Sequence, residues 1–223
     1  RQLAKEAPVE ADLVMPFPDS GNYAAIGYSE AAGIPFEMGM IRNHYVGRTF
    51  IRPSQEIRDY SVRKKYNPVR HVLEGKRVVL VDDSIVRGTT CKEIVQMARD
   101  AGARNVYFAS AAPPVRYPNV YGIDMPSASE LIAHDRTVEE VRDLIGADWL
   151  VYQDLDDLIS CVNDVNEDIN GWECSVFTGD YITGDVDEAY LTRLEDLRKD
   201  EKRSTSQVAN ADNAIIDLHN DED

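Results

Sequence analysis

Short apolar runs alternate with amphipathic segments along most of this chain. The strongest run, Arg77–Val81, has four consecutive apolar residues, three of them valine, which is typical of a strand buried on both faces of a parallel sheet. The segment Thr89–Ala101 has apolar residues at helical spacing and ends before Gly102, so it is predicted as a helix. The same reasoning predicts further strands at residues 12–16, 35–41, 105–109 and 149–152, and further helices at residues 23–32, 55–66, 129–133, 138–145 and 155–165.

This alternation of strands and helices indicates an α/β fold with a doubly wound, mainly parallel sheet. Residues 1–165 are therefore expected to form the core, and residues 166–203 a C-terminal helical appendage that ends in a helix at 187–199. The tail, residues 204–223, contains five acidic residues and no lysine or arginine. A segment of this composition cannot bury enough apolar surface to fold, so we predict that it is disordered.

Charge is distributed unevenly. The 223 residues carry a formal net charge of −16, which argues against a nucleic-acid or membrane surface as the partner. Residues 42–70 are the exception, since they contain eight Lys or Arg residues against two acids. We interpret this basic segment as phosphate-binding; the alternative interpretation is a solvated helix face.

The cellular location is predicted from what the sequence does not contain. No apolar run approaches the roughly 18 residues that cross a bilayer, and the chain does not begin with a basic and then apolar signal peptide. Cys91, Cys161 and Cys174 lack metal-ligand spacing, which is typical of reduced thiols. We therefore expect a cytoplasmic protein in which all three cysteines are buried.

The chemistry concentrates in the loop that follows the strongest strand, because ligands of open parallel sheets bind beyond the carboxyl ends of the strands. Gly88 permits a left-handed turn, and Thr89 and Thr90 place hydroxyls beside the free amides of a helix start, which suits a phosphate group. Asp82 and Asp83 would repel phosphate and suit ribose hydroxyls or Mg²⁺ instead. The alternative is a simple strand-ending turn with a helix cap.

The run Val79–Thr90 resembles the motif with which type I phosphoribosyltransferases bind 5-phosphoribosyl-1-pyrophosphate (PRPP). Three further blocks, residues 43–51, 110–114 and 121–127, resemble the glutamine amidophosphoribosyltransferase family, and the similarity extends from about Ala11 to Leu194. This resemblance implies a type I phosphoribosyltransferase fold, in which a core sheet carries a hood and a flexible loop.

The resemblance also implies roles for individual residues. The expected catalytic residues are Asp82, Asp83 and Arg48, the last of these in the basic loop 42–65 that would close over pyrophosphate. Asp82 and Asp83 would contact the ribose or its Mg²⁺, and Ser20 would join them at the metal, although an Asp-Ser turn that caps a helix is as good a reading of Ser20. The residues expected to hold the 5-phosphate are Ser84, Ile85, Val86, Arg87, Gly88, Thr89 and Thr90.

Other polar and aromatic residues are assigned smaller roles. His44 lies in the basic loop and is expected near pyrophosphate, whereas His134 is expected to be structural. Trp149 and Trp172 are interpreted as core residues.

The implied reaction is pentosyl transfer, in which ammonia displaces pyrophosphate from PRPP to give 5-phosphoribosylamine, the first committed step of purine synthesis. The implied partners are Mg²⁺, a glutaminase domain that supplies ammonia, purine nucleotides as feedback inhibitors, and further copies of the chain. Two alternatives remain: a salvage phosphoribosyltransferase, for which no stacking aromatic for a nucleobase is identified, and a non-catalytic PRPP-sensing module.

The sequence departs from the family pattern in three respects. It has no N-terminal nucleophilic cysteine of a glutaminase domain, and the opening strand of the transferase domain is expected to be missing. Some family members bind an iron–sulfur cluster through four cysteines that include a CxxC pair. Because the stretch that begins at Cys174 lacks such a pair, no cluster is predicted.

Overall fold

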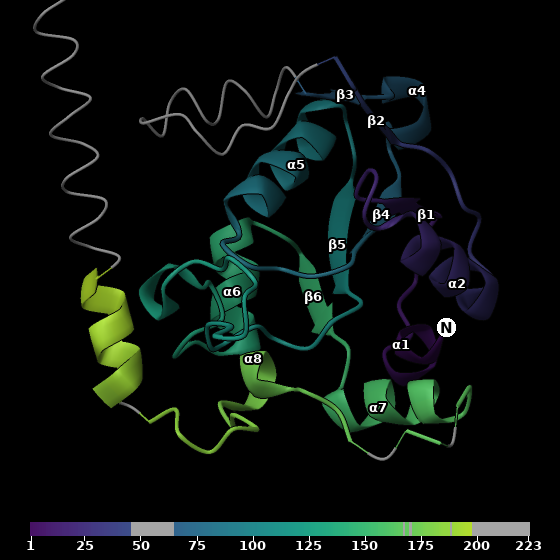
Figure 1. The fold of residues 1–223 in the computed structure, drawn as a ribbon. Coiled ribbons are helices and arrows are strands. Elements are labelled where there is room, and N and C mark those ends of the chain that lie inside the picture. Colours follow the sequence, from purple (N-terminus) through teal and green to yellow (C-terminus); the bar gives the residue numbers. More distant parts are fainter. Residues whose placement is uncertain (46–64, 167, 170, 188, 198–223) are drawn as a thin grey trace, which may run out of the picture.

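The computed structural model describes residues 1–45, 65–166, 168–169, 171–187 and 189–197 (Figure 1). Its centre is a four-stranded sheet in the order β1-β4-β5-β6, and every neighbouring pair is parallel. This confirms the mainly parallel sheet predicted from the sequence. The strands are β1 (Leu13–Pro16), β4 (Arg77–Asp82), β5 (Asn105–Ser110) and β6 (Trp149–Tyr152).

Helices cover both faces of the sheet, because its strands are apolar on both sides. On one face Val14, Val79 and Val81 pack with residues of α1 (Gln2–Glu6) and α2 (Asn22–Ala32). On the other face Met15, Leu80 and Phe108 pack with α5 (Thr89–Asp100) and α6 (Val138–Ile145). The last helix of this unit, α7 (Leu155–Asn163), contacts α1. The sheet is thus doubly wound, as expected.

A small antiparallel ribbon departs from the sequence-based prediction. It pairs β2 (Met40–Arg42) with β3 (Tyr66–Pro68), and the short helix α4 (Arg70–Leu73) follows. The predicted strand at 35–41 is therefore wrong in extent, since Phe36 forms only an isolated bridge to Val14. The predicted helix at 55–66 lies outside the described residues up to 64, and its last residue belongs to β3. Pairing across more than twenty intervening residues has no local signal in the sequence.

The predicted helix at 129–133 is only the 3₁₀ turn η1 (Ala128–Glu130). A tertiary contact explains the difference, because the Ile132 amide, which would donate to the Ala128 carbonyl in an α-helix, donates to the Val86 carbonyl at 2.9 Å instead. Beyond the turn, Arg136 donates to the Ile132 carbonyl and Arg116 donates to the Ala133 carbonyl.

The appended segment packs against the stretch that follows β5. The backbone amides of Arg116 and Tyr117 donate to the carbonyl of Val176, in the short helix α8 (Ser175–Thr178), and the Tyr181 hydroxyl donates to Pro118. Residues 189–197 are helical, as predicted within the range 187–199, whereas Asp187 is described and lies before the helix. The division at residue 165 remains a prediction, and the tail at 204–223 lies outside the described residues. In the described part of the chain, no helix is long and apolar enough to span a membrane.

Candidate functional site

The candidate site lies at the carboxyl ends of β1, β4 and β5, where three loops meet. The amide of Phe17 donates to the Val81 carbonyl at 2.7 Å, and the amide of Ala111 donates to the Asp82 carbonyl at 2.9 Å. Both bonds hold a neighbouring loop against the end of β4. The parallel register therefore brings the two aspartates and Ser20 to one edge of the sheet, as sequence reasoning expected.

Asp82 is a buried carboxylate, with only 5% of its surface exposed. Its Oδ1 atom accepts hydrogen bonds from the Ser20 hydroxyl and from the Asp83 amide, each at 2.8 Å. Burial, together with the negative charge of Asp83, raises the pKa of Asp82 to about 7. Among the described residues neither aspartate forms an ion pair, so the pair lacks a positive partner.

This donor set fits a hard cation. Protein sites for Mg²⁺ commonly use one or two carboxylates and leave the other positions to water and substrate phosphate, and Asp82, Asp83 and the Ser20 hydroxyl provide such a set. A closed all-protein metal site is not formed, because the described residues contain no group of three or more His, Cys, Asp or Glu side chains that could hold an ion.

Of the remaining loop residues, some are buried in the core and others are exposed to solvent. Asp83 is exposed and accepts a hydrogen bond from the Ser84 hydroxyl at 2.8 Å. Ile85 is fully buried in the core, so only its backbone can serve the phosphate contact expected of it. Arg87 is exposed and Val86 half-buried, and the Val86 carbonyl accepts the Ile132 amide at 2.9 Å.

The first turn of α5 is available to an anion. Gly88 is its N-cap residue, with φ at +74°, and no side chain caps the helix. The backbone amides of this turn therefore have no side-chain acceptor and lie at the positive end of the helix dipole. Thr89 is exposed and Thr90 half-buried, and both add a hydroxyl here, as predicted from the sequence.

The Ser20 loop approaches β4 closely because residue 21 is glycine. A Cβ atom there would lie 2.1 Å from the Val81 carbonyl oxygen, a backbone conflict that no side-chain movement would relieve. The Pro18–Asp19 peptide bond in this loop is cis. The sequence is compatible with two roles for Ser20, one in a turn that caps a helix and one in a loop beside the metal. Its bond to Asp82 joins it to the site, and no side-chain cap is formed at the start of α2.

The structure adds a contact that sequence reasoning missed. Asp19 Oδ2 accepts a hydrogen bond from Arg42 at 2.9 Å, and the His44 ring nitrogen lies 4.0 Å from the same oxygen. The Asn43 amide bonds to the Lys65 carbonyl at 2.6 Å beside the β2–β3 ribbon. Arg48 and most of the basic segment lie outside the described residues.

The predictions for the cysteines, His134 and the tryptophans agree with the structure only in part. Cys91 is buried, but Cys161 is exposed and Cys174 only half-buried, so the expectation of three buried cysteines is wrong. The reason for Cys161 is its place on α7, which has no buried residue. His134 Nδ1 lies 2.7 Å from the Arg116 carbonyl oxygen, which gives it the expected structural contact. Both tryptophans are half-buried.

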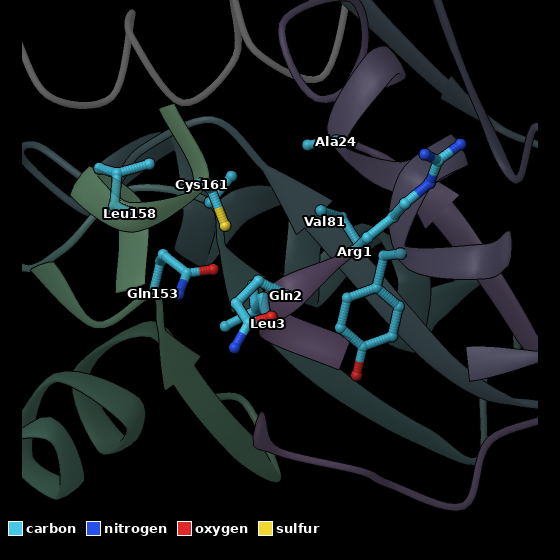
Figure 2. Close-up of a pocket in the computed structure, with 10 residues that line it drawn as sticks. Arg1, Gln2, Leu3, Ala24, Val81, Gln153, Leu158 and Cys161 are labelled. Atoms are coloured by element: carbon cyan, nitrogen blue, oxygen red, sulfur yellow. The ribbon is translucent and has the colours of Figure 1, made fainter. Parts of the chain in front are cut away.

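A separate cavity lies on the α1 and α2 face of the sheet (Figure 2). Its volume is about 190 Å³, and none of the residues from Asp82 to Thr90 lines it. We therefore do not assign it to the candidate site. Residues that line it include Arg1, Gln2, Leu3, Ala24, Val81, Gln153, Leu158 and Cys161.

Comparison with known proteins was consistent with this site. No protein-family model matches the chain. It is 58% identical over 221 residues to the amidophosphoribosyltransferase of Pseudomonas aeruginosa, covering 99% of this chain and 44% of the relative. It is 51% identical to that of Escherichia coli, covering 99% of this chain and 43% of the relative. The chain thus spans less than half the length of these curated relatives.

Solved structures give the same result. The glutamine PRPP amidotransferase of Bacillus subtilis, complexed with ADP and GMP, is 50% identical, and the match covers 81% of this chain and 40% of that one with a TM-score of 0.70. A structure described as the allosteric regulatory enzyme of purine biosynthesis is 49% identical with the same TM-score, covering 81% of this chain and 39% of that one. Over nearly its whole length, the chain is thus similar to a part of amidophosphoribosyltransferases that makes up less than half of each relative.

Proposed function

We propose that this chain is the phosphoribosyl-transfer part of an amidophosphoribosyltransferase, in which ammonia displaces pyrophosphate from C1 of PRPP to give 5-phosphoribosylamine. One observation carries the proposal. The buried Asp82 carboxylate and the uncapped first turn of α5 lie at the same end of β4, in a chain 58% identical to an amidophosphoribosyltransferase. A cation-binding group and a phosphate-binding group thus flank a single loop.

Each part of the loop has a role that follows from its chemistry. The segment from Ser84 to Thr90 holds the 5-phosphate with its backbone amides and threonine hydroxyls. Asp82 and Asp83 bind ribose hydroxyls or Mg²⁺, and Ser20 orients the Asp82 carboxylate through their hydrogen bond. Mg²⁺, when bound, supplies positive charge that stabilises the departing pyrophosphate. Arg48 is the proposed catalytic cation of the basic segment.

The reaction is a substitution at one carbon atom. The bond from C1 to the pyrophosphate oxygen breaks, and its electron pair leaves with pyrophosphate. The lone pair of ammonia forms the new C1–N bond, and the nitrogen then gives up one proton. Positive charge develops on the ribose ring in the transition state, as in glycoside chemistry. The protein therefore has to orient the ribose, stabilise the leaving group and exclude water, which would otherwise attack C1.

The partners are proposed from the relatives. The B. subtilis relative is named as a glutamine-dependent enzyme and was solved with two purine nucleotides, so we propose a glutaminase domain as the ammonia source and purine nucleotides as inhibitors. Assembly with further copies of the chain and a cytoplasmic location belong to the same proposal.

The test is product analysis with the purified chain. PRPP, Mg²⁺ and ammonium should give pyrophosphate and 5-phosphoribosylamine in equal amounts, whereas free purine bases should give no nucleotide. Replacing Asp82 and Asp83 by Asn preserves their shape and removes their charge. We expect the double variant to lose about 2–4 kcal/mol of transition-state stabilisation, the usual scale for a preorganised electrostatic contact.

Asp156→Asn is the matched control, because Asp156 is exposed on α7 and away from the loop. Circular dichroism should show that all variants fold. Unchanged turnover of the double variant at saturating Mg²⁺ would refute the assigned roles. Nucleotide formation from a free base would instead identify a salvage enzyme.

A further inference from the structure

The Ser20 loop and the β2–β3 ribbon are joined by an ion pair. Asp19 Oδ2 accepts from Arg42 Nη1 at 2.9 Å, and the His44 ring nitrogen lies 4.0 Å from the same oxygen. Asp19 and Arg42 are each partly shielded, with side chains 41% and 30% exposed. The Arg42 guanidinium and the His44 ring thus face the same carboxylate.

In the sequence, Asp19 is next to Ser20, which contacts the proposed catalytic residue Asp82. Asp19 directly precedes Ser20, and Ser20 donates to Asp82 at 2.8 Å. Arg42 and His44 in turn lie just before the basic segment to which pyrophosphate binding is assigned. Asp19 therefore lies between the metal-binding carboxylates and the cations that would meet the leaving group.

Arg42 is not saturated by Asp19. A guanidinium group carries five N–H donors, and the Nε atom of Arg42 is buried with no hydrogen-bond partner among the described residues. A buried donor without an acceptor is unfavourable. An incoming anion with several oxygens offers more acceptors than the single Asp19 oxygen that Nη1 contacts.

We propose that Asp19 is a positioning residue that acts as an internal anion, competing with product pyrophosphate for Arg42 and His44 and so promoting its release. When pyrophosphate is bound, it shares or takes Arg42 and lies beside His44. When pyrophosphate leaves, Asp19 pairs with Arg42 again, so the guanidinium is not left as an uncompensated charge. The restored pairing reduces the free-energy cost of dissociation. While pyrophosphate remains bound, the Asp19 carboxylate repels it. The inference rests on the proposed function.

The probe is inorganic pyrophosphate, and its affinity and dissociation rate are measured on the whole chain with Mg²⁺ by calorimetry and stopped flow. Asp19→Asn keeps the side-chain shape and removes the charge. We expect it to bind pyrophosphate about three- to tenfold more tightly, mainly through slower dissociation, the scale for removing one partly exposed charge. If product release limits turnover, kcat should fall while KM for PRPP falls or stays constant.

Three further variants make the test specific. Asp19→Glu keeps the charge and should stay close to wild type. Glu30→Gln removes the carboxylate of another surface ion pair, with Arg1, and should have no effect. In an Arg42→Gln background, Asp19→Asn should tighten binding by a smaller factor than it does with Arg42 present, because the main competing cation is gone.

The outcomes separate the two proposals. Pyrophosphate binding that Asp19→Asn tightens more with Arg42 present than in the Arg42→Gln background supports the inference, and equal tightening in both backgrounds overturns it. Unchanged or weaker binding by Asp19→Asn, with a folded variant and a wild type that binds pyrophosphate, overturns this inference and leaves the proposed function intact. No pyrophosphate binding by the wild-type chain overturns both.

Discussion

At the scale of single residues, Asp82 shows a conflict between stability and function. A carboxylate that is 5% exposed, with another carboxylate beside it, is costly to ionise. Two hydrogen bonds to Oδ1 lower that cost without removing it. Groups held in such an unfavourable state are typical of functional sites, because a ligand can provide the missing charge.

This conflict gives a testable pH dependence. The unfolded carboxyl has a pKa near 3.9, and the folded one about 7. Between these values the folded protein retains a proton that the unfolded chain releases, so the stability contributed by Asp82 falls as pH rises from about 4 to 7. Asp82→Asn lacks this penalty. We therefore expect it to be more stable than wild type by about 1–3 kcal/mol at pH 8, with the gain disappearing towards pH 4.

The measurement is urea unfolding from pH 4 to pH 8 with a chelator present and without PRPP, so that no cation offsets the charge. Asp156→Asn is the control and should show no such trend. A gain in stability that is the same at every pH would contradict the raised pKa of Asp82, and so would no gain at pH 8.

At the scale of elements, the start of α5 differs from the starts of its neighbours. Thr137 caps α6 in a reciprocal box with Glu140, and Asp154 caps α7. α5 begins at Gly88 without any side-chain cap, which leaves its amides to a ligand. As a consequence, the start of α5 depends on glycine at position 88 and on the packing of Ile132.

Gly88→Ala tests this element. A Cβ at Gly88 would lie 2.1 Å from Ile132 Cδ1, and the residue has a positive φ of +74°. Gly146, the C-cap of α6, has a similar φ of +75° but no atom within 4 Å of an added Cβ. We expect Gly146→Ala to cost about 1 kcal/mol from backbone strain alone, and Gly88→Ala roughly 2–4 kcal/mol because overpacking adds to the strain.

Thermal unfolding measures both losses. Ile132→Val removes the methyl group that lies nearest to the added Cβ, so it should recover part of the loss in Gly88→Ala and none in Gly146→Ala. Equal losses for the two glycine variants would mean that the Ile132 contact contributes nothing. PRPP affinity should fall in Gly88→Ala and remain unchanged in Gly146→Ala.

At the scale of the whole molecule, none of the three cysteines is activated as a nucleophile by the part of the chain that the structure describes. Burial raises the pKa of Cys91 well above its usual value, and burial also raises the pKa of Cys174. Cys161 is exposed, and among the described residues no histidine or lysine forms a hydrogen bond with it. A glutaminase of the cysteine type needs a reactive thiolate with an activating base or amine.

We therefore expect a preparation of these 223 residues to use ammonia and not glutamine as its nitrogen donor. The measurement is 5-phosphoribosylamine formation with each donor at equal concentration and at a pH where free ammonia is present. Cys161→Ser should leave the ammonia reaction unchanged. Formation from glutamine by the purified chain, with no other subunit present, would contradict the expectation.

The sequence by itself determined the motif and its elements. The run from Val79 to Thr90 places a strand, two carboxylates, a glycine and a helix start in consecutive positions, so its structure follows from local periodicity and side-chain chemistry. The parallel sheet followed in the same way, because buried strands alternate with amphipathic helices. The prediction of a helix at residues 129–133 was wrong, because the Ile132 amide bonds to the carbonyl of Val86, a residue distant in the sequence.

Only the tertiary structure decided which groups meet at the site. Ser20 and Asp82 are 62 residues apart, and Asp19 and Arg42 are 23 residues apart, so neither contact has a signature in a local pattern. The high pKa of Asp82 has the same origin. It depends on desolvation by the surrounding fold and on the bonds that offset it, and these quantities exist only once distant segments have packed together.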